Sequence, residues 1–324
     1  ELVQWAASPD PDVQFQGARS LADLAITEEH RVRIVKAGGL KPLVLLLSAE
    51  RVEIQRCAVI SVANLALNDE NQSKLNEEGV LPPLIALAHS SDSDMQLNVA
   101  RALANLAFCH EQNEQDIVKL AGLDPLLQLI SLSPEIETQM ESAAAIANLA
   151  RNSENQRKIV ETGFLVPLNS CMRSNNAELM RQAARCLANV SLNADNQKEM
   201  KEHGVAAPLI AALNSDSHDL QRLSAMALAN LSMYEEMQVH LVNDGILKPI
   251  NELLKSENED IELQAARCLA SLSQNENLKV QIARDVGIPH FIKMARNRPK
   301  EIQMLAAACL ANLSSVKGAA ASWS

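Results

Sequence analysis

The stretch EEGVLPPLIALAHSSDSDMQLNVARALANLAF, Glu77 to Phe108, carries the features that decide the fold. It opens near Gly79, whose missing β-carbon allows the positive φ that turns the chain from one helix into the next. An apolar segment with a proline in its first turn follows, then a turn rich in Ser and Asp. Asp94–Ala107 reads as a longer helix that begins with an acid and ends in Ala-Asn-Leu-Ala. With the short polar segment Asn68–Glu78 before it, this pattern predicts a unit of three helices.

The unit recurs along the whole chain. The Asn of Ala-Asn-Leu, or a residue aligned with it, returns after 41, 41, 43, 41, 41, 41 and 41 residues, at Asp23, Asn64, Asn105, Asn148, Asn189, Asn230, Ser271 and Asn312. An acid stands eleven residues before each of these markers, where it complements the positive end of the helix dipole. The turn glycine recurs with them, and we expect positive φ at Gly38, Gly79, Gly122, Gly163, Gly204, Gly245 and Gly287. One such unit cannot bury its own apolar faces, so stacked units must share a continuous core.

Composition narrows the class of protein. A net charge of -11 and seven aromatic residues argue against nucleic-acid binding, which needs basic side chains and stacking platforms. No apolar run reaches the roughly 18 residues of a membrane span, and the first residues do not resemble a secretory signal. The six cysteines form no C-x-x-C pair, which favours a reduced compartment and a cytoplasmic or nuclear protein. We find no catalytic or metal-binding motif, and we expect no enzymatic activity, no cofactor and no metal.

The unit Glu77 to Phe108 resembles an armadillo repeat, and the resemblance extends from about Glu1 to Ser314. It implies an all-α fold, a right-handed α-solenoid superhelix of about eight repeats with three helices each. We assign residues 1–316 to a single armadillo-repeat domain whose first repeat is incomplete, and residues 317–324 to a linker and affinity-tag remnant. The chain is most similar to the β-catenin-like and vacuolar-armadillo type, which implies a scaffold or adaptor for partner proteins. It also implies membrane tethering only through a missing N-terminal extension, without membrane insertion.

In armadillo proteins the third helices line a concave groove, and their Asn side chains bind the backbone of an extended peptide. The resemblance implies this peptide-binding role for Asn64, Asn105, Asn148, Asn189, Asn230 and Asn312. A carboxamide suits the task because it offers two donors and an acceptor to any peptide group. In the alternative, each Asn bonds a neighbouring helix and only holds the stack together. An Asn in mid-helix is disfavoured by propensity, which favours the peptide-binding interpretation.

Arginines lie one or two turns before the markers, on the face that the Asn side chains share. We assign them to the same site: Arg56, Arg101, Arg181, Arg185, Arg222 and Arg267. Guanidinium groups pair with carboxylate and phosphate, so we expect the groove to favour acidic peptide segments. In the alternative, these arginines bond acidic residues of adjacent repeats.

Other functions remain open at this point. A nuclear import receptor of the importin-α type carries Trp where this chain carries Arg, Ile, Ala and Met, so that function is less favoured. The chain is alternatively a regulatory or oligomerising region of a larger protein. Self-association through the ends of the solenoid is a further possibility, because Leu2, Val3 and Trp5 are poorly covered.

Overall fold

The computed structural model describes residues 1–315, so the predicted linker at 317–324 lies outside the described part. All regular structure between residues 1 and 315 is helical. Contacts between backbone positions group the helices into two units, Glu1–Pro167 and a second one that begins at Leu168. The assignment of residues 1–316 to a single domain stays a prediction.

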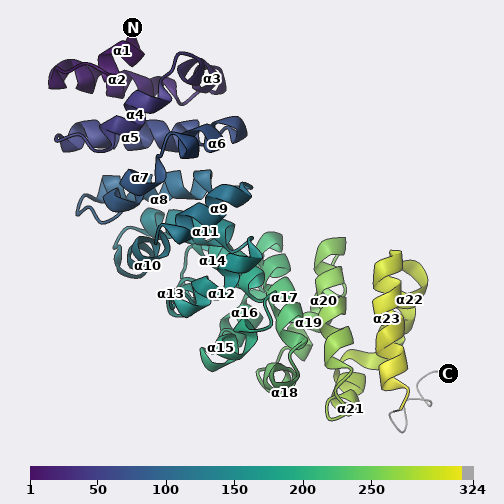
Figure 1. The fold of residues 1–324 in the computed structure, drawn as a ribbon. Helices are drawn as coiled ribbons and strands as arrows, with labels where there is room; N and C mark the ends of the chain where they lie inside the picture. The colour runs from purple at the N-terminus through teal and green to yellow at the C-terminus, as the bar shows by residue number, and fades with distance from the viewer. Residues whose placement is uncertain (316–324) are drawn as a thin grey trace. The chain divides into compact units, whose positions relative to one another are not determined.

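The first unit repeats a pattern of two short helices and one long helix (Figure 1). It begins with a short and a long helix, α1 (Leu2–Ala6) and α2 (Pro11–Leu24). Three full repeats follow: α3 (Glu28–Lys36), α4 (Leu40–Leu46) and α5 (Val52–Leu65); α6 (Asp69–Glu77), α7 (Leu81–Leu87) and α8 (Ser93–Leu106); α9 (Glu111–Lys119), α10 (Leu123–Leu132) and α11 (Ile136–Leu149). Helix α12 (Ser153–Glu161) opens the next repeat, and α13 (Leu165–Cys171) crosses the boundary between the units.

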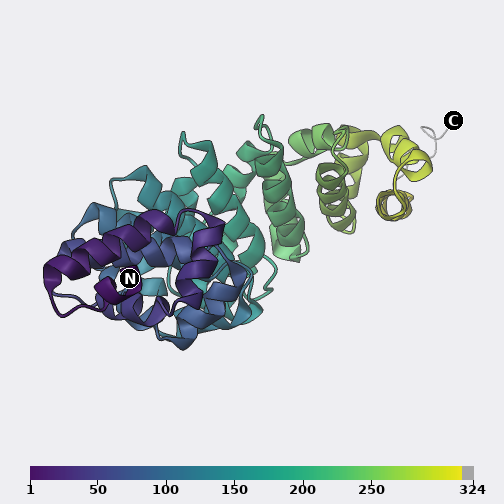
Figure 2. The ribbon, with the colours of Figure 1, turned by 90° about the horizontal axis from the view of Figure 1, so that it is seen from above.

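The second unit continues the pattern, and its repeats follow one another from teal-green to yellow in both views (Figures 1 and 2). Its helices are α14 (Ala177–Val190), α15 (Asn196–Glu202), α16 (Ala206–Ala212), α17 (His218–Ser232), α18 (Glu235–Asn243), α19 (Leu247–Leu253), α20 (Glu259–Leu272), α21 (Lys279–Ile282), α22 (Ile288–Asn297) and α23 (Lys300–Leu313). A single π-helical turn, Ala283–Gly287, connects α21 to α22.

The long third helices pack against one another inside each unit. In the first unit α2, α5, α8 and α11 are neighbours in that order, and in the second unit α14, α17, α20 and α23 are. A small residue five positions before the marker allows neighbouring third helices to approach closely, because the Ala side chain takes up little space between the two backbones. This residue is buried at Ala18, Ala100, Ala143, Ala184, Ala225 and Ala266. The predicted acid also lies in the first turn of every third helix, from Asp12 in α2 to Glu301 in α23.

The turn between first and second helices confirms one prediction and corrects another. Six of the seven marker glycines have positive φ, between 64° at Gly204 and 98° at Gly163. Gly122 does not. Ala121 takes the left-handed conformation there instead, with φ 61°. The register differs because this repeat carries an extra residue in the α8–α9 turn, where Cys109 also has positive φ, 55°.

We expect Ala121→Gly to stabilise the protein by up to about 1 kcal/mol. A left-handed Ala costs roughly 1–2 kcal/mol, and the larger conformational entropy that glycine loses on folding offsets part of the gain. Thermal and urea unfolding would measure it. The matched change Ala37→Gly, at a right-handed turn residue with φ -80°, is expected to destabilise. Destabilisation by Ala121→Gly would contradict the assignment of strain.

Candidate functional site

The marker asparagines join successive third helices. In five repeats, Nδ2 of the Asn donates a hydrogen bond to an acceptor in the preceding repeat. These bonds run from Asn64 to Ala22 O (3.5 Å), Asn105 to Ala63 O (2.8 Å), Asn148 to Ala104 O (2.8 Å), Asn230 to Ala188 O (3.3 Å) and Ser191 Oγ (3.0 Å), and Asn312 to Ser273 Oγ (2.9 Å). Asn189 takes the same position on α14 and is half-buried. The structural alternative is therefore present in the fold.

These bonds leave room for a second role at some of the positions. One bond uses one of the two N–H groups of a carboxamide, and its carbonyl oxygen is a separate acceptor. Asn64, Asn105 and Asn312 are half-buried, so a ligand can reach part of each side chain. Asn148 and Asn230 are only 4% and 2% exposed, which makes them poorer contacts. The role of all six in peptide binding stays a prediction.

Ser271 shows which part of the asparagine the scaffold needs. Its hydroxyl donates to Ser232 O at 2.7 Å and joins α20 to α17, at a carbonyl nearer the helix end than the ones that Asn64 and Asn105 reach. A hydroxyl therefore supplies an inter-helix bond of its own without offering the rest of a carboxamide. Asp23, the other departure from the pattern, lies exposed on α2.

In the first unit, the site arginines reach forward to acids of the next repeat. Arg56 on α5 pairs with Asp92 at the start of α8 and lies 3.9 Å from Asp94. Arg101 on α8 donates through Nε to Glu141 on α11 at 2.8 Å. A hydrogen bond from the Met95 amide, with Arg56 beside it, holds the pKa of Asp92 below its ordinary value. Both arginines therefore already have a carboxylate partner.

In the second unit, three of the site arginines interact with side chains of their own helices. Arg181 makes a bidentate pair with Glu178, at 2.8 and 2.5 Å, and this pair lowers the pKa of Glu178. Arg222 lies 4.0 Å from Asp219. Arg267 donates to the neutral Gln264 at 2.8 Å. Arg185 is half-buried on α14, one turn after Arg181.

Two buried carboxyl groups, those of Glu114 and Glu262, were not predicted from the sequence. Glu114 on α9 stands where Gln72, Gln156 and Gln238 each donate Nε2 to the carboxyl-terminal carbonyl of the preceding third helix, at 3.1, 3.2 and 2.9 Å. Burial raises the pKa of Glu114 to about 7. Aligning the first helices as well as the markers would have revealed the exchange.

Glu262 on α20 is the second such group. In five other repeats a glutamine at this position donates to a carbonyl of the preceding turn, as Gln96 does to Ser90 O at 2.8 Å; the others are Gln55, Gln139, Gln221 and Gln303. The side chain of Glu262 is fully buried and lies 2.9 Å from Arg298 Nε. Burial raises its pKa, and Arg298 opposes that rise.

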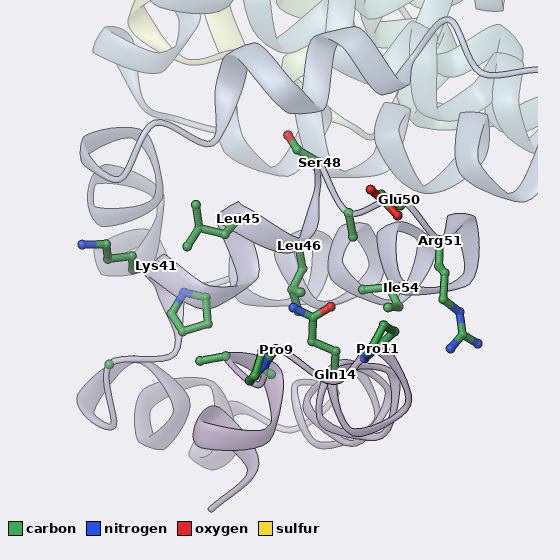
Figure 3. Close-up of a pocket in the computed structure, with 15 residues that line it drawn as sticks. Pro9, Pro11, Gln14, Lys41, Leu45, Leu46, Ser48, Glu50, Arg51 and Ile54 are labelled. Atoms are coloured by element: carbon green, nitrogen blue, oxygen red, sulfur yellow. The ribbon is translucent and has the colours of Figure 1, made fainter.

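A cavity of about 740 Å³ lies in the first unit beside the turns between second and third helices (Figure 3). Pro9, Pro11 and Gln14 line one side, and Leu45 and Leu46 of α4 line another. Smaller cavities occupy the same place beside Gln96, with about 180 Å³, and beside Gln221, with about 490 Å³. They mark a recurring gap between neighbouring second helices, and none of the predicted site residues lines them.

Other potential chemistry is limited in the described part of the chain. Residues 1–315 contain no cluster of three or more His, Cys, Asp or Glu that could hold a metal ion. No helix there is both long and apolar enough to cross a bilayer. Cys186, Cys268 and Cys309 are buried, and burial raises the pKa of each thiol to about 12.

Comparisons with known proteins agree with this architecture. The armadillo/beta-catenin-like repeat model matches residues 68–108 and 110–151. A designed armadillo repeat protein has a TM-score of 0.68 to this chain, with 30% identity over 71% of this chain and 98% of its own. The chain belongs to the armadillo-repeat family. The model of kinesin-associated protein (KAP) matches residues 142–321, more than half of this armadillo-repeat chain.

Three further relatives extend the comparison. An engineered protein of known crystal structure has a TM-score of 0.92 and 32% identity, covering 97% of this chain and 78% of its own. A designed armadillo repeat protein in complex with the peptide (KR)4 has a TM-score of 0.67 and 25% identity, covering 72% of this chain and 99% of its own. Vacuolar protein 8 of Candida albicans is 29% identical over 48% of this chain, and the match spans only 20% of that protein.

Proposed function

We propose that this armadillo-repeat chain is a non-enzymatic scaffold that binds extended peptide segments of partner proteins along its third helices. The observation that carries the proposal is that the carboxamides of Asn64, Asn105 and Asn312 lie half-buried at the same position of their third helices. Each has hydrogen-bonding groups beyond the one N–H that joins the helices. The designed relative in complex with (KR)4 supports a peptide ligand for repeats of this kind.

The partner segments are proposed to be acidic, and to bind best along α17 and α20. In the first unit an acidic ligand must compete with Asp92 for Arg56 and with Glu141 for Arg101. In the second unit Arg267 bonds only a neutral amide among its described contacts, and Arg222 lies at the limit of pairing with Asp219. Guanidinium groups in that situation gain more from a ligand carboxylate.

Peptide affinity measured by fluorescence anisotropy tests the acidic preference. We expect a labelled Glu-rich peptide to bind more tightly than a Lys/Arg-rich one. Arg222→Gln with Arg267→Gln should weaken its binding at least tenfold, since each charge-assisted bond is worth about 1.5–3 kcal/mol. The control pair Arg33→Gln and Arg157→Gln makes the same charge change on exposed first-helix positions. Equal weakening by both pairs, or preference for the basic peptide, would reject the acidic ligand.

A serine substitution separates the two roles of the asparagines. We expect Asn64→Ser with Asn105→Ser to retain more of the stability than the alanine pair, because Ser271 shows that a hydroxyl at this position can bond the preceding third helix, at Ser232 O near its end. We expect the alanine pair to lose about 1 kcal/mol per site. Both pairs should weaken peptide binding. Unchanged binding by the serine pair would leave the asparagines with a structural role only.

A second candidate function is that of an accessory region in a larger assembly, which the match to the kinesin-associated protein model favours. Co-elution of this chain with a recombinant kinesin in gel filtration would support it, and separate elution at micromolar concentrations would reject it. We place either function in the cytoplasm, because six free and largely buried cysteines suit a reducing compartment.

A further inference from the structure

The end of the third helix, three residues after the marker, carries an exposed apolar side chain in several repeats. In the first unit these are Ile26 (64% exposed), Leu67 (51%) and Phe108 (48%). Within the second unit, Leu192 (61%) and Met233 (69%) take the same position. Side chains of this size at one position of successive repeats form a line rather than a scatter. Isolated exposed apolar residues need no explanation, but a line of them marks an interaction site.

Acidic residues follow these apolar residues in the sequence, two or three positions later. Ile26 is followed by Glu28 and Glu29, and Leu67 by Asp69 and Glu70. Phe108 is followed by the exposed Glu111. Three residues of chain span at most about 11 Å, so each acid lies close to its apolar neighbour. The helix dipole accounts for acids in a first turn, but it does not account for the apolar side chains beside them.

Contacts between repeats show that these turns adjoin one another in the first unit. His110 Nε2 lies 2.7 Å from Ser73 Oγ of the preceding first helix. Arg151, which takes the place of the apolar residue in the following repeat, reaches Cys109 Sγ at 3.1 Å. Helix α2 also packs against α5, and α5 against α8, so Ile26, Leu67 and Phe108 with their five acids form one surface, which we call the turn edge. Arg151 limits it at one end.

The basic groups near the turn edge are largely occupied. Arg31 donates to Ala25 O and Ile26 O at 2.9 and 2.8 Å. Arg33 lies 3.7 Å from Glu29, and Lys74 lies 3.9 Å from Glu70. Exposed pairs of this kind are weak and leave the acids accessible to a competing cation. Asp69, Glu28 and Glu111 add further negative charge.

We propose that the turn edge of the first unit docks a basic amphipathic helix of a partner protein. Packed helices lie about 8–10 Å apart, and an α-helix rises about 10.5 Å in seven residues. Apolar side chains seven residues apart share one face of a helix, so they meet Ile26, Leu67 and Phe108 in turn. A β-strand covers the same distance in three residues, but its side chains then alternate between faces. Lys and Arg beside the apolar stripe would pair with the acids.

A designed probe tests this proposal by anisotropy. The probe is a labelled helical peptide with Leu at every seventh position and Lys along one flank; its comparisons are a scrambled peptide, a Glu-for-Lys peptide and one broken by proline. We expect the chain to prefer the first at least tenfold. Leu67→Ser with Phe108→Ser should weaken its binding about tenfold, as should Asp69→Asn with Glu70→Gln. The control pair Leu45→Ser and Leu132→Ser removes apolar side chains from second helices that are even more exposed.

Several outcomes would overturn the proposal. Equal binding of the scrambled or proline-broken peptide, or equal loss in the control pair, would remove the turn edge as the site. Concentration-dependent dimerisation that Leu67→Ser with Phe108→Ser abolishes would assign the surface to a second copy of this chain. Binding of the chain to anionic lipid vesicles through the same residues would assign it to a membrane. Loss of binding on Arg222→Gln with Arg267→Gln, rather than on the turn-edge variants, would place the peptide in the groove instead.

Discussion

Replacing Glu114 by Gln is expected to raise the free energy of unfolding at pH 8 by up to about 3 kcal/mol, because each unit of pKa is worth about 1.4 kcal/mol. Burial raises the pKa of this carboxyl from 4.5 to about 7. Its side chain is 4% exposed and stands where other repeats place a glutamine donor near the carbonyl end of a helix. A neutral amide removes the buried charge and restores the donor.

The raised pKa of Glu114 also predicts how the free energy of unfolding changes with pH. The folded state binds the Glu114 proton more tightly than the unfolded state, so its contribution favours folding below pH 4.5 and is lost as the pH rises to about 7. Urea unfolding from pH 4.5 to 8 should show this loss in the natural chain, and Glu114→Gln should remove it. Glu154→Gln, an exposed change in the first turn of α12, is the control. A loss of stability on Glu114→Gln at pH 8 would contradict the account.

Replacing Arg298 by Ala is expected to lower the free energy of unfolding by about 2–3 kcal/mol, because it leaves a buried carboxylate without its cation. Glu262 is fully buried, and its only ion pair among the described residues is with Arg298 Nε at 2.9 Å. Adding Glu262→Gln should restore most of the stability, since glutamine at this position bonds a turn carbonyl in five other repeats, as in Gln96 to Ser90 O.

The double-mutant cycle separates this pair from the packing of α22 and α23. Arg296→Ala, a nearby exposed change, should cost less than about 0.5 kcal/mol. Full additivity of Arg298→Ala and Glu262→Gln in thermal unfolding would show that the two groups do not interact. A cost of Arg298→Ala that persists at a pH where Glu262 is protonated would also show this, because protonation removes the buried charge.

The period of the sequence predicted the fold in detail because its signals act locally. Gly79 and Gly163 lie in turns that need positive φ, and the acid and asparagine positions mark the two ends of each third helix. Prediction failed at Gly122, where an inserted residue moved the turn to Ala121. The glycine of the motif is still present in this repeat, but the residue with positive φ is the one before it.

The candidate site was less predictable because its groups interact between repeats. The sequence places Arg56 and Arg101 on one face, but it does not state that Asp92 and Glu141 of the next repeats reach them. It likewise left two roles for Asn105, and the bond to Ala63 O became visible only in three dimensions. Glu114 and Glu262 stand where other repeats have glutamine, which has the same shape and is also polar. The repeat pattern therefore did not mark them as buried carboxyl groups.

Photo-crosslinking tests the proposed binding of peptide along the third helices most directly. A Glu-rich peptide carrying a benzophenone side chain at its centre would be bound, irradiated and mapped by mass spectrometry of the crosslinked fragments. We expect crosslinks on α17 and α20 that a tenfold excess of unlabelled peptide removes. Competable crosslinks confined to first helices such as α15 and α18, with none on third helices, would contradict the proposal.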